Sequence, residues 1–167
     1  MLIYHPAFDP YHCIFRVLRL LDKLPPASYE LDRIRILDFY LLFPSAISEM
    51  KFPNTYRKYR KLAGSKNKYE LIRDPLRAFI QLEPFQKSGI AELAARGFIS
   101  SEALSTNKVL CANKIIPDSL ASAVRKANTE DAHFMELLTG PMLQIDLYGE
   151  SGLRGRTKLF EYRYDPI

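Results

Sequence analysis

The sequence has few cysteines and no long apolar run, and each shortage excludes a class of protein. Its 167 residues include two cysteines, Cys13 and Cys111, which lie far apart and in no paired spacing. This excludes a disulfide scaffold and a thiolate metal cluster, and makes a reducing cytoplasm the expected location. The longest apolar run, Phe39–Phe43, is far below the roughly 18 residues that span a bilayer. The first residues also lack a basic stretch followed by an apolar one, so neither a membrane-spanning nor a visibly secreted protein is expected.

The composition that remains is that of one globular domain. Hydrophobic residues make up 47% and charged residues 26% of the chain, which is enough to build a core. No internal repeat or low-complexity tract is present. A single domain over residues 1–167 is therefore expected.

Positive charge is concentrated in one segment. The whole chain has a net charge of +5, but residues 51–73 alone carry eight basic residues against one acidic residue, a net +7. The rest of the chain is therefore at −2. A local cationic patch indicates the charge of a binding partner and says little about the fold, so an anionic partner is expected at this segment.

Two helices are predicted before residue 50. Asp9 is placed to cap a first helix that has Pro10 at its first position, with Arg16 and Arg19 on its polar face. Two prolines after Leu24 end this helix, and apolar spacing predicts a second helix over 28–43. Because its last turns are apolar all round, this second helix is expected in the centre of the core.

Residues 74–99 have the pattern of a helix-turn-helix. Asp74 and Pro75 start one helix, and Pro84 is expected to begin another after a tight turn. Gly97 suits the left-handed position that ends a helix. Phe98 and Ile99 then extend the chain, and residues 109–112 are expected to return as the second strand of a wing.

The C-terminal third gives weaker signals. A helix is predicted over 117–126, and Asn128 is expected to cap a following helix that ends at Gly140. The glycine-rich stretch 149–158 is expected to be a mobile basic loop. Alternation of aromatic and charged residues over 160–164 predicts a strand.

These elements predict a mostly α fold with a small β component. Its core is expected to be a winged helix-turn-helix with extra N- and C-terminal helices. The predicted parts are an N-terminal strap with helices (1–50), the basic segment (51–73), the helix-turn-helix (74–99) and a C-terminal extension (100–167).

The basic segment is the candidate nucleic-acid site. Cations alternate there with tyrosines, which suits phosphate neutralisation together with stacking on bases or sugars, although a solvated face would show the same charges. The candidate residues are Arg57, Lys58, Arg60, Lys61, Lys66 and Lys68. In contrast, the predicted recognition helix over 85–96 exposes Gln86, Lys87, Glu92 and Arg96, a weak set for reading bases, so protein contact by the winged helix is at least as well favoured.

Evidence for catalysis is sparse. His5, Asp9 and His12 could hold a metal in a small hydrolase, but a fourth ligand is missing and the spacing matches no standard ligand pair. No nucleophile elbow occurs, and the stretch 149–158 lacks the order of a P-loop. The expectation is therefore a protein that is not an enzyme and has no cofactor and no metal.

Two further sets of residues stand out. Asp38 lies inside an apolar stretch, where burial of a lone carboxylate is costly, so it is expected to pair with Arg35 or with a distant arginine.

The chain termini are rich in aromatic residues, which serve as anchors in protein interfaces. The candidate partner-binding residues are Tyr4, Phe8, Tyr11, Phe160, Tyr162 and Tyr164.

Three stretches also carry a resemblance to a known family. They are YHPAFDPYHCIFRVLRLL near the N-terminus, RIRILDFYLLFP, and RDPLRAF followed by LAARGFIS. Together they resemble the middle component of bacterial ABC-three-component conflict systems, the group that includes Lamassu-type antiphage defence. Tyr4, His5, Pro6, Asp9, Pro10, Tyr11 and His12 correspond to the family's N-terminal segment.

The resemblance implies a non-catalytic adaptor in the cytoplasm. Such a winged-helix subunit would link an SMC-like or Rad50-like ATPase to an effector protein, would have no membrane partner and could contact DNA. The alternative from the residues is a free-standing winged-helix DNA-binding regulator, acting through residues 85–96 as a symmetric dimer.

Overall fold

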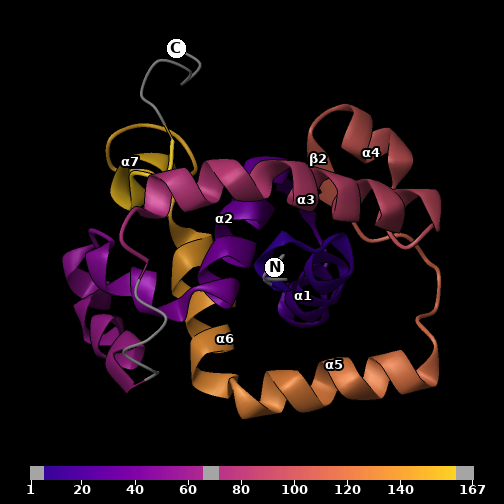
Figure 1. Ribbon diagram of the computed structural model, residues 1–167, viewed down its shortest axis with the longest axis horizontal. Helices are drawn as coiled ribbons and strands as arrows, with labels where there is room; N and C mark the ends of the chain where they lie inside the picture. The colour runs from indigo at the N-terminus through magenta and orange to yellow at the C-terminus, as the bar shows by residue number, and fades with distance from the viewer. Residues whose placement is uncertain (1–5, 66–71, 161–167) are drawn as a thin grey trace, which may run out of the picture.

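A computed structural model describes residues 6–65 and 72–160, and these fold mainly into helices with one two-stranded antiparallel sheet (Figure 1). The α-helices and strands are α1 (Pro10–Lys23), β1 (Ser28–Glu30), α2 (Leu31–Leu42), α3 (Pro75–Ala95), α4 (Ser101–Ser105), β2 (Lys108–Leu110), α5 (Asp118–Glu130), α6 (Ala132–Thr139) and α7 (Leu153–Thr157). The 3₁₀ helices are η1 (Pro6–Phe8), η2 (Pro44–Glu49), η3 (Asn54–Ser65) and η5 (Pro141–Gln144). The predicted mostly α class with a small β component is thereby confirmed.

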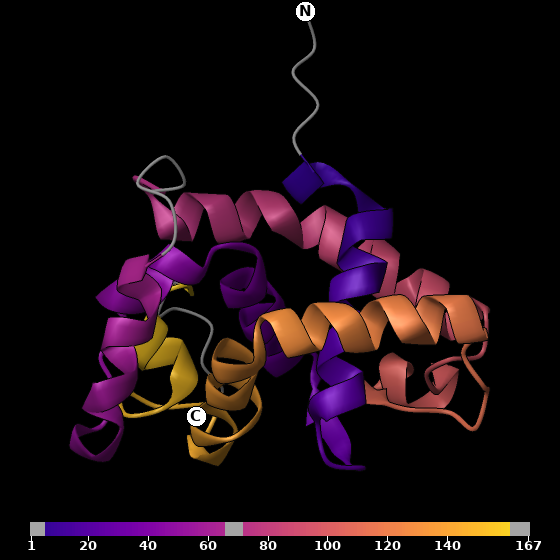
Figure 2. The same ribbon diagram turned by 90° about the horizontal axis from the view of Figure 1, so that it is seen from below.

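Helix α1 lies between α3 and α5 and also contacts α2 (Figures 1 and 2). The basic segment η3 is at one end of the long axis of the molecule, and α4 is at the other end (Figures 1 and 2). The cations of η3 are therefore far from the predicted wing, which lies near α4.

The start of α1 follows the prediction, but its polar face does not. Asp9 accepts a hydrogen bond from the Tyr11 amide at 2.8 Å, with Pro10 at the first helical position. Arg16 and Arg19 were predicted on an exposed face, and both are buried. The prediction is wrong because these side chains find buried partners on α2 and α5.

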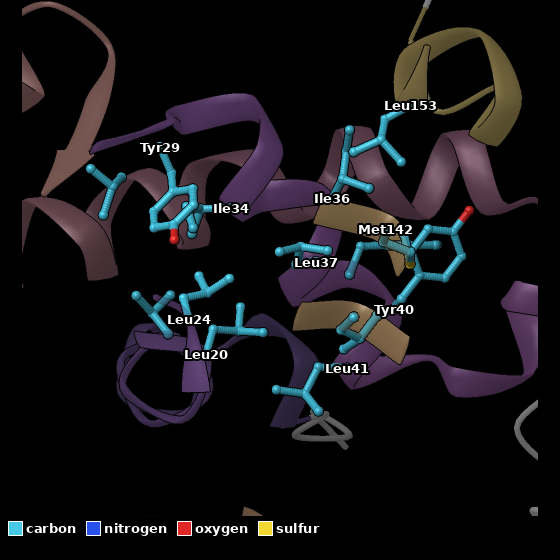
Figure 3. Packing of buried hydrophobic residues seen from close by; sticks show 14 of the residues in the cluster. Leu20, Leu24, Tyr29, Ile34, Ile36, Leu37, Tyr40, Leu41, Met142 and Leu153 are labelled. Carbon is cyan, nitrogen blue, oxygen red and sulfur yellow. The ribbon is translucent and has the colours of Figure 1, made fainter. Parts of the chain in front are cut away.

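Helix α2 is the centre of the core, as predicted, but it begins at Leu31 rather than at residue 28. Residues 28–30 instead pair with Leu110–Lys108 as β1, an antiparallel contact more than seventy residues away in sequence that no local pattern shows. Figure 3 shows Leu20 of α1 and Leu24, the residue after this helix, pointing toward Ile34 and Leu37 of α2. These residues belong to one apolar cluster that extends across the molecule.

The predicted turn at Pro84 is wrong, because α3 continues through this residue from Pro75 to Ala95. Proline removes one helical hydrogen bond, and Pro84 and Ile80 both lie on the exposed side of α3. Buried side chains on both sides of Pro84, including Phe79 and Ile90, hold the two halves against the core. A winged helix-turn-helix core is not confirmed.

The end of α3 matches the prediction. Gly97 has φ +79°, and the Phe98 amide donates to the Leu93 carbonyl at 2.9 Å. Ile99 then forms an antiparallel bridge with Cys111, so the predicted extended segments do meet. The second of these segments also forms β2, which pairs with β1. The sequence pattern did not indicate this pairing.

The C-terminal part departs from prediction in two places. Helix α5 continues to Glu130, so Asn128 is a buried residue within it and not the cap of the next helix. Residues 153–157 form α7 with Arg154 and Gly155 buried, where a mobile loop was expected. Helix α6 ends before Gly140 as predicted, and the predicted strand at 160–164 lies, beyond Phe160, outside the described residues.

A separate finding concerns membranes. Within residues 6–65 and 72–160, no helix combines the length and the apolar character that crossing a bilayer requires.

Candidate interaction surfaces

A buried polar network joins the three helices α1, α2 and α3. Arg16 donates to both carboxylate oxygens of Asp38, with Nε 2.6 Å from Oδ1 and Nη2 3.2 Å from Oδ2. The Gln86 amide donates to Oδ2 of Asp38 at 2.9 Å. Asp38 is 1% exposed. The prediction that Asp38 pairs with a distant arginine is therefore confirmed, and the pairing is structural.

Arg35 extends this network to the surface. Its Nε donates to Oε1 of Gln86 at 3.1 Å, and its terminal nitrogens reach Asp32 and Glu83, each at 2.9 Å. Gln86 was predicted to be an exposed position of the recognition helix, but it is 0% exposed and donates to both Asp38 and the Arg35 carbonyl. The predicted recognition helix over 85–96 is thus the second half of α3, with Gln86, Ile90 and Leu93 facing the core.

A second polar contact locks α1 to α5. Arg19 donates through Nε to the Asn128 side chain at 3.0 Å and through Nη2 to Asp131 at 2.8 Å. The Asn128 amide returns a hydrogen bond to the Arg19 carbonyl at 3.0 Å. These contacts hold α1 and α5 together, and Asn128 also lines a cavity of about 260 Å³ beside α5 and α6.

The cations of η3 form the clearest charged surface. Arg57, Lys58, Arg60 and Lys61 are all exposed. Arg60 donates through Nη2 to the Met50 carbonyl at 3.2 Å, which holds its guanidinium against the preceding segment. Four of the six predicted nucleic-acid residues therefore share one exposed helix. The other two, Lys66 and Lys68, lie outside the described residues.

The tyrosines of η3 do not share that exposure. Tyr56 and Tyr59 are half-buried and pack against the apolar core. Lys58 places its Nζ 5.0 Å from the ring centroid of Tyr59, so this cation covers part of the ring surface that the core leaves exposed. The sequence pattern predicted tyrosines that stack on bases or sugars, but in the structure these side chains pack against the core and hold η3 to it.

The predicted aromatic anchors are found in different settings. Tyr11 is 75% exposed, and Phe8 is 38% exposed with its ring 5.5 Å from that of Phe85 on α3. Phe160 packs on Phe79 at 5.0 Å between ring centroids, under the guanidinium of Arg154. Tyr4, Tyr162 and Tyr164 lie outside the described residues.

The predicted metal-binding set of His5, Asp9 and His12 is described only in part. His12 lies 3.9 Å from Asp9, and His5 is outside the described residues. No group of three possible metal-binding side chains is found among residues 6–65 and 72–160. Burial raises the pKa of the Cys13 thiol well above its usual value, with Asp38 adding to the effect, so this thiol stays protonated.

A polar cavity of about 340 Å³ opens beside the buried network. Asp32, Arg35, Lys87 and Lys108 line it, and Arg35 already pairs with Asp32. Glu83, which bridges Arg35 and Lys87, has a lowered pKa: burial opposes ionisation, but the hydrogen bonds and charges of these two cations outweigh it. The charges of Asp32, Arg35 and Lys87 at this cavity are thus used in internal pairs, which favours a structural role.

Comparison with known families places the chain in one family. The family described as ABC-three component (ABC-3C) system Middle Component 5 matches residues 2–165. The chain belongs to this family. No curated protein and no solved structure matches this Middle Component 5 chain significantly. As the middle component of a multi-component system, the protein has protein partners.

Proposed function

We propose that this Middle Component 5 protein is a non-catalytic adaptor in an antiphage defence complex of the Lamassu type, linking an SMC-like or Rad50-like ATPase to an effector. The family match over residues 2–165 carries the proposal, because it makes the chain one component among several. The polar side chains Arg16, Asp38 and Gln86 bind one another and hold helices together, as expected of a scaffold.

The N-terminal aromatic pair is the proposed partner contact. Phe8 and Tyr11 are exposed on adjoining turns, at η1 and the start of α1. Large aromatic side chains are the usual anchors of protein interfaces. Phe160 is assigned to internal packing instead, because its ring contacts Phe79 and Arg154.

The exposed cations of η3 are the proposed DNA contact. Helix η3, which carries these cations, lies at one end of the molecule, away from η1 and the start of α1 (Figure 2). Separate positions allow an adaptor to hold a protein partner and DNA at the same time.

Co-purification tests the adaptor role. The tagged chain is expressed together with the products of its neighbouring genes, and the captured proteins are assayed for ATP hydrolysis. The full complex is expected to contain an SMC-like or Rad50-like ATPase, and the isolated chain is expected to hydrolyse no ATP. Capture of no ATPase would refute the adaptor role.

A variant pair locates the contact. Phe8→Ala with Tyr11→Ala is expected to weaken capture of the ATPase at least tenfold, whereas Ile115→Ala, which removes an isolated side chain that is 86% exposed, leaves capture unchanged. Equal capture by both variants would assign the interface to another surface while leaving the adaptor role intact.

A further inference from the structure

The sequence of η3 repeats every three residues, which is also the number of residues in one turn of its 3₁₀ helix. Residues 56–61 read Tyr-Arg-Lys-Tyr-Arg-Lys, a period of three, and η3 is a 3₁₀ helix, which has three residues per turn. Side chains three apart therefore stand one above the other. The segment presents a row of two tyrosines, a row of two arginines and a row of two lysines, each running along the helix.

The three rows have different surroundings. The tyrosine row, Tyr56 and Tyr59, packs on the core, while the arginine and lysine rows are exposed. Cations of one row are spaced by one turn, about 6 Å along the axis. The structure thus builds two parallel rows of positive charge and directs the aromatic rings inward.

This division limits the ligand. Proteins that bind single-stranded nucleic acid combine a positively charged groove with exposed aromatic rings on which the bases stack. Here the core holds Tyr56 and Tyr59, and Lys58 lies over the Tyr59 ring. Contact with phosphates is still available to the cations of η3. This contact favours the duplex over a single strand, because the duplex carries about one negative charge per 1.7 Å and releases more counterions per contact.

We infer that η3 binds the phosphate backbone of double-stranded DNA through its two cationic rows, without stacking on bases and without reading sequence. This inference rests on the DNA contact of the proposed function and specifies its ligand. A continuous duplex favours two parallel rows of charge more than an acidic protein segment does, because the duplex repeats its phosphates along both strands at close spacing.

Binding of DNA by the full chain tests the inference. A labelled duplex and a labelled single strand of the same sequence and length are titrated over a series of salt concentrations. The test variant replaces Arg57, Lys58, Arg60 and Lys61 with Ala. The control variant replaces the exposed Lys23, Arg77, Arg125 and Lys126 with Ala and so removes the same total charge from other surfaces.

The wild-type chain is expected to bind the duplex more tightly than the single strand, with no dependence on base sequence. Each lost phosphate contact on a duplex lowers the slope of log affinity against log salt by about 0.9, so the test variant is expected to lose up to about 3.6 and the control variant almost nothing. Thermal unfolding monitored by circular dichroism verifies that both variants fold.

Four results would overturn the inference. They are tighter binding of the single strand, an unchanged salt slope in the test variant, an equal loss of slope in the control variant, and tighter binding of polyglutamate than of the duplex. Because capture of the ATPase is measured separately, the adaptor role can survive each of these results.

Discussion

Arg16 and Asp38 form a buried ion pair between α1 and α2, with Nε 2.6 Å from Oδ1, although 22 residues separate them. Gln86 of α3 donates to the second oxygen of the same carboxylate. One carboxylate thus fixes the positions of three helices. A buried charge is costly unless it is paired, so removing one partner leaves the other uncompensated.

Replacing Asp38 with Asn is expected to lower the free energy of unfolding by about 3–5 kcal/mol, because the Arg16 guanidinium stays buried without its counter-charge. Urea denaturation measures the loss. The control is Glu92→Gln, which breaks the exposed pair between Glu92 and Arg96 and is expected to cost less than about 1 kcal/mol. Equal losses at the two sites would contradict the assigned role of Asp38.

Replacing Pro84 with Ala is expected to raise the free energy of unfolding by about 1–2 kcal/mol. Alanine restores the helical hydrogen bond to the Ile80 carbonyl that proline removes from the middle of α3, and the greater freedom of the unfolded chain offsets part of this gain. Thermal and urea unfolding measure the change. A destabilised variant would show that the restored hydrogen bond does not outweigh the added freedom of the unfolded chain.

The two thiols are expected to differ in reactivity. Cys13 is fully buried and burial raises its thiol pKa, whereas Cys111 is exposed, with a smaller rise in pKa from partial burial. Ellman's reagent is therefore expected to modify one thiol per native chain and two in denaturant. Cys111→Ser should abolish the native reaction, and a native reaction that persists in this variant would show that Cys13 is accessible.

Acid is expected to weaken the contact between α2 and α3 at Glu83. The pKa of this carboxyl is lowered from its usual 4.5, because Lys87 and Arg35 outweigh the opposing effect of burial. The stabilisation is therefore complete above about pH 4.5 and is lost as the pH falls through the lowered pKa. Glu83→Gln should show a shallower fall in unfolding free energy over this range, and parallel curves for the two proteins would contradict the assignment.

Local signals in the sequence predicted several helix ends correctly, although Pro84 and Asn128 turned out to lie inside helices. Asp9 and Asp74 cap the helices predicted from them, and Gly97 has the left-handed conformation expected at a helix end. These features depend on a few neighbouring residues, so the sequence contains them directly. The exposure of Arg57 and Lys58 was predictable for the same reason.

The errors come from contacts between distant segments. Arg16, Arg19 and Gln86 were predicted to be exposed because they are polar, and each is buried by a partner on another helix. Residues 28–30 become a strand through pairing with 108–110, and Pro84 stays helical because the core holds both halves of α3. Tertiary packing decides these cases, and no local pattern encodes it.

The match between the three-residue repeat of η3 and its helix sets how this segment can change in length. Inserting one residue before Tyr56 leaves the rows intact, but inserting one between Lys58 and Tyr59 rotates everything after it by about 120° relative to what precedes it. Tyr59 would then leave the core and a cation would turn toward it. Within the repeat, therefore, viable insertions and deletions come in whole turns of three residues, a constraint that natural variants of this segment should obey.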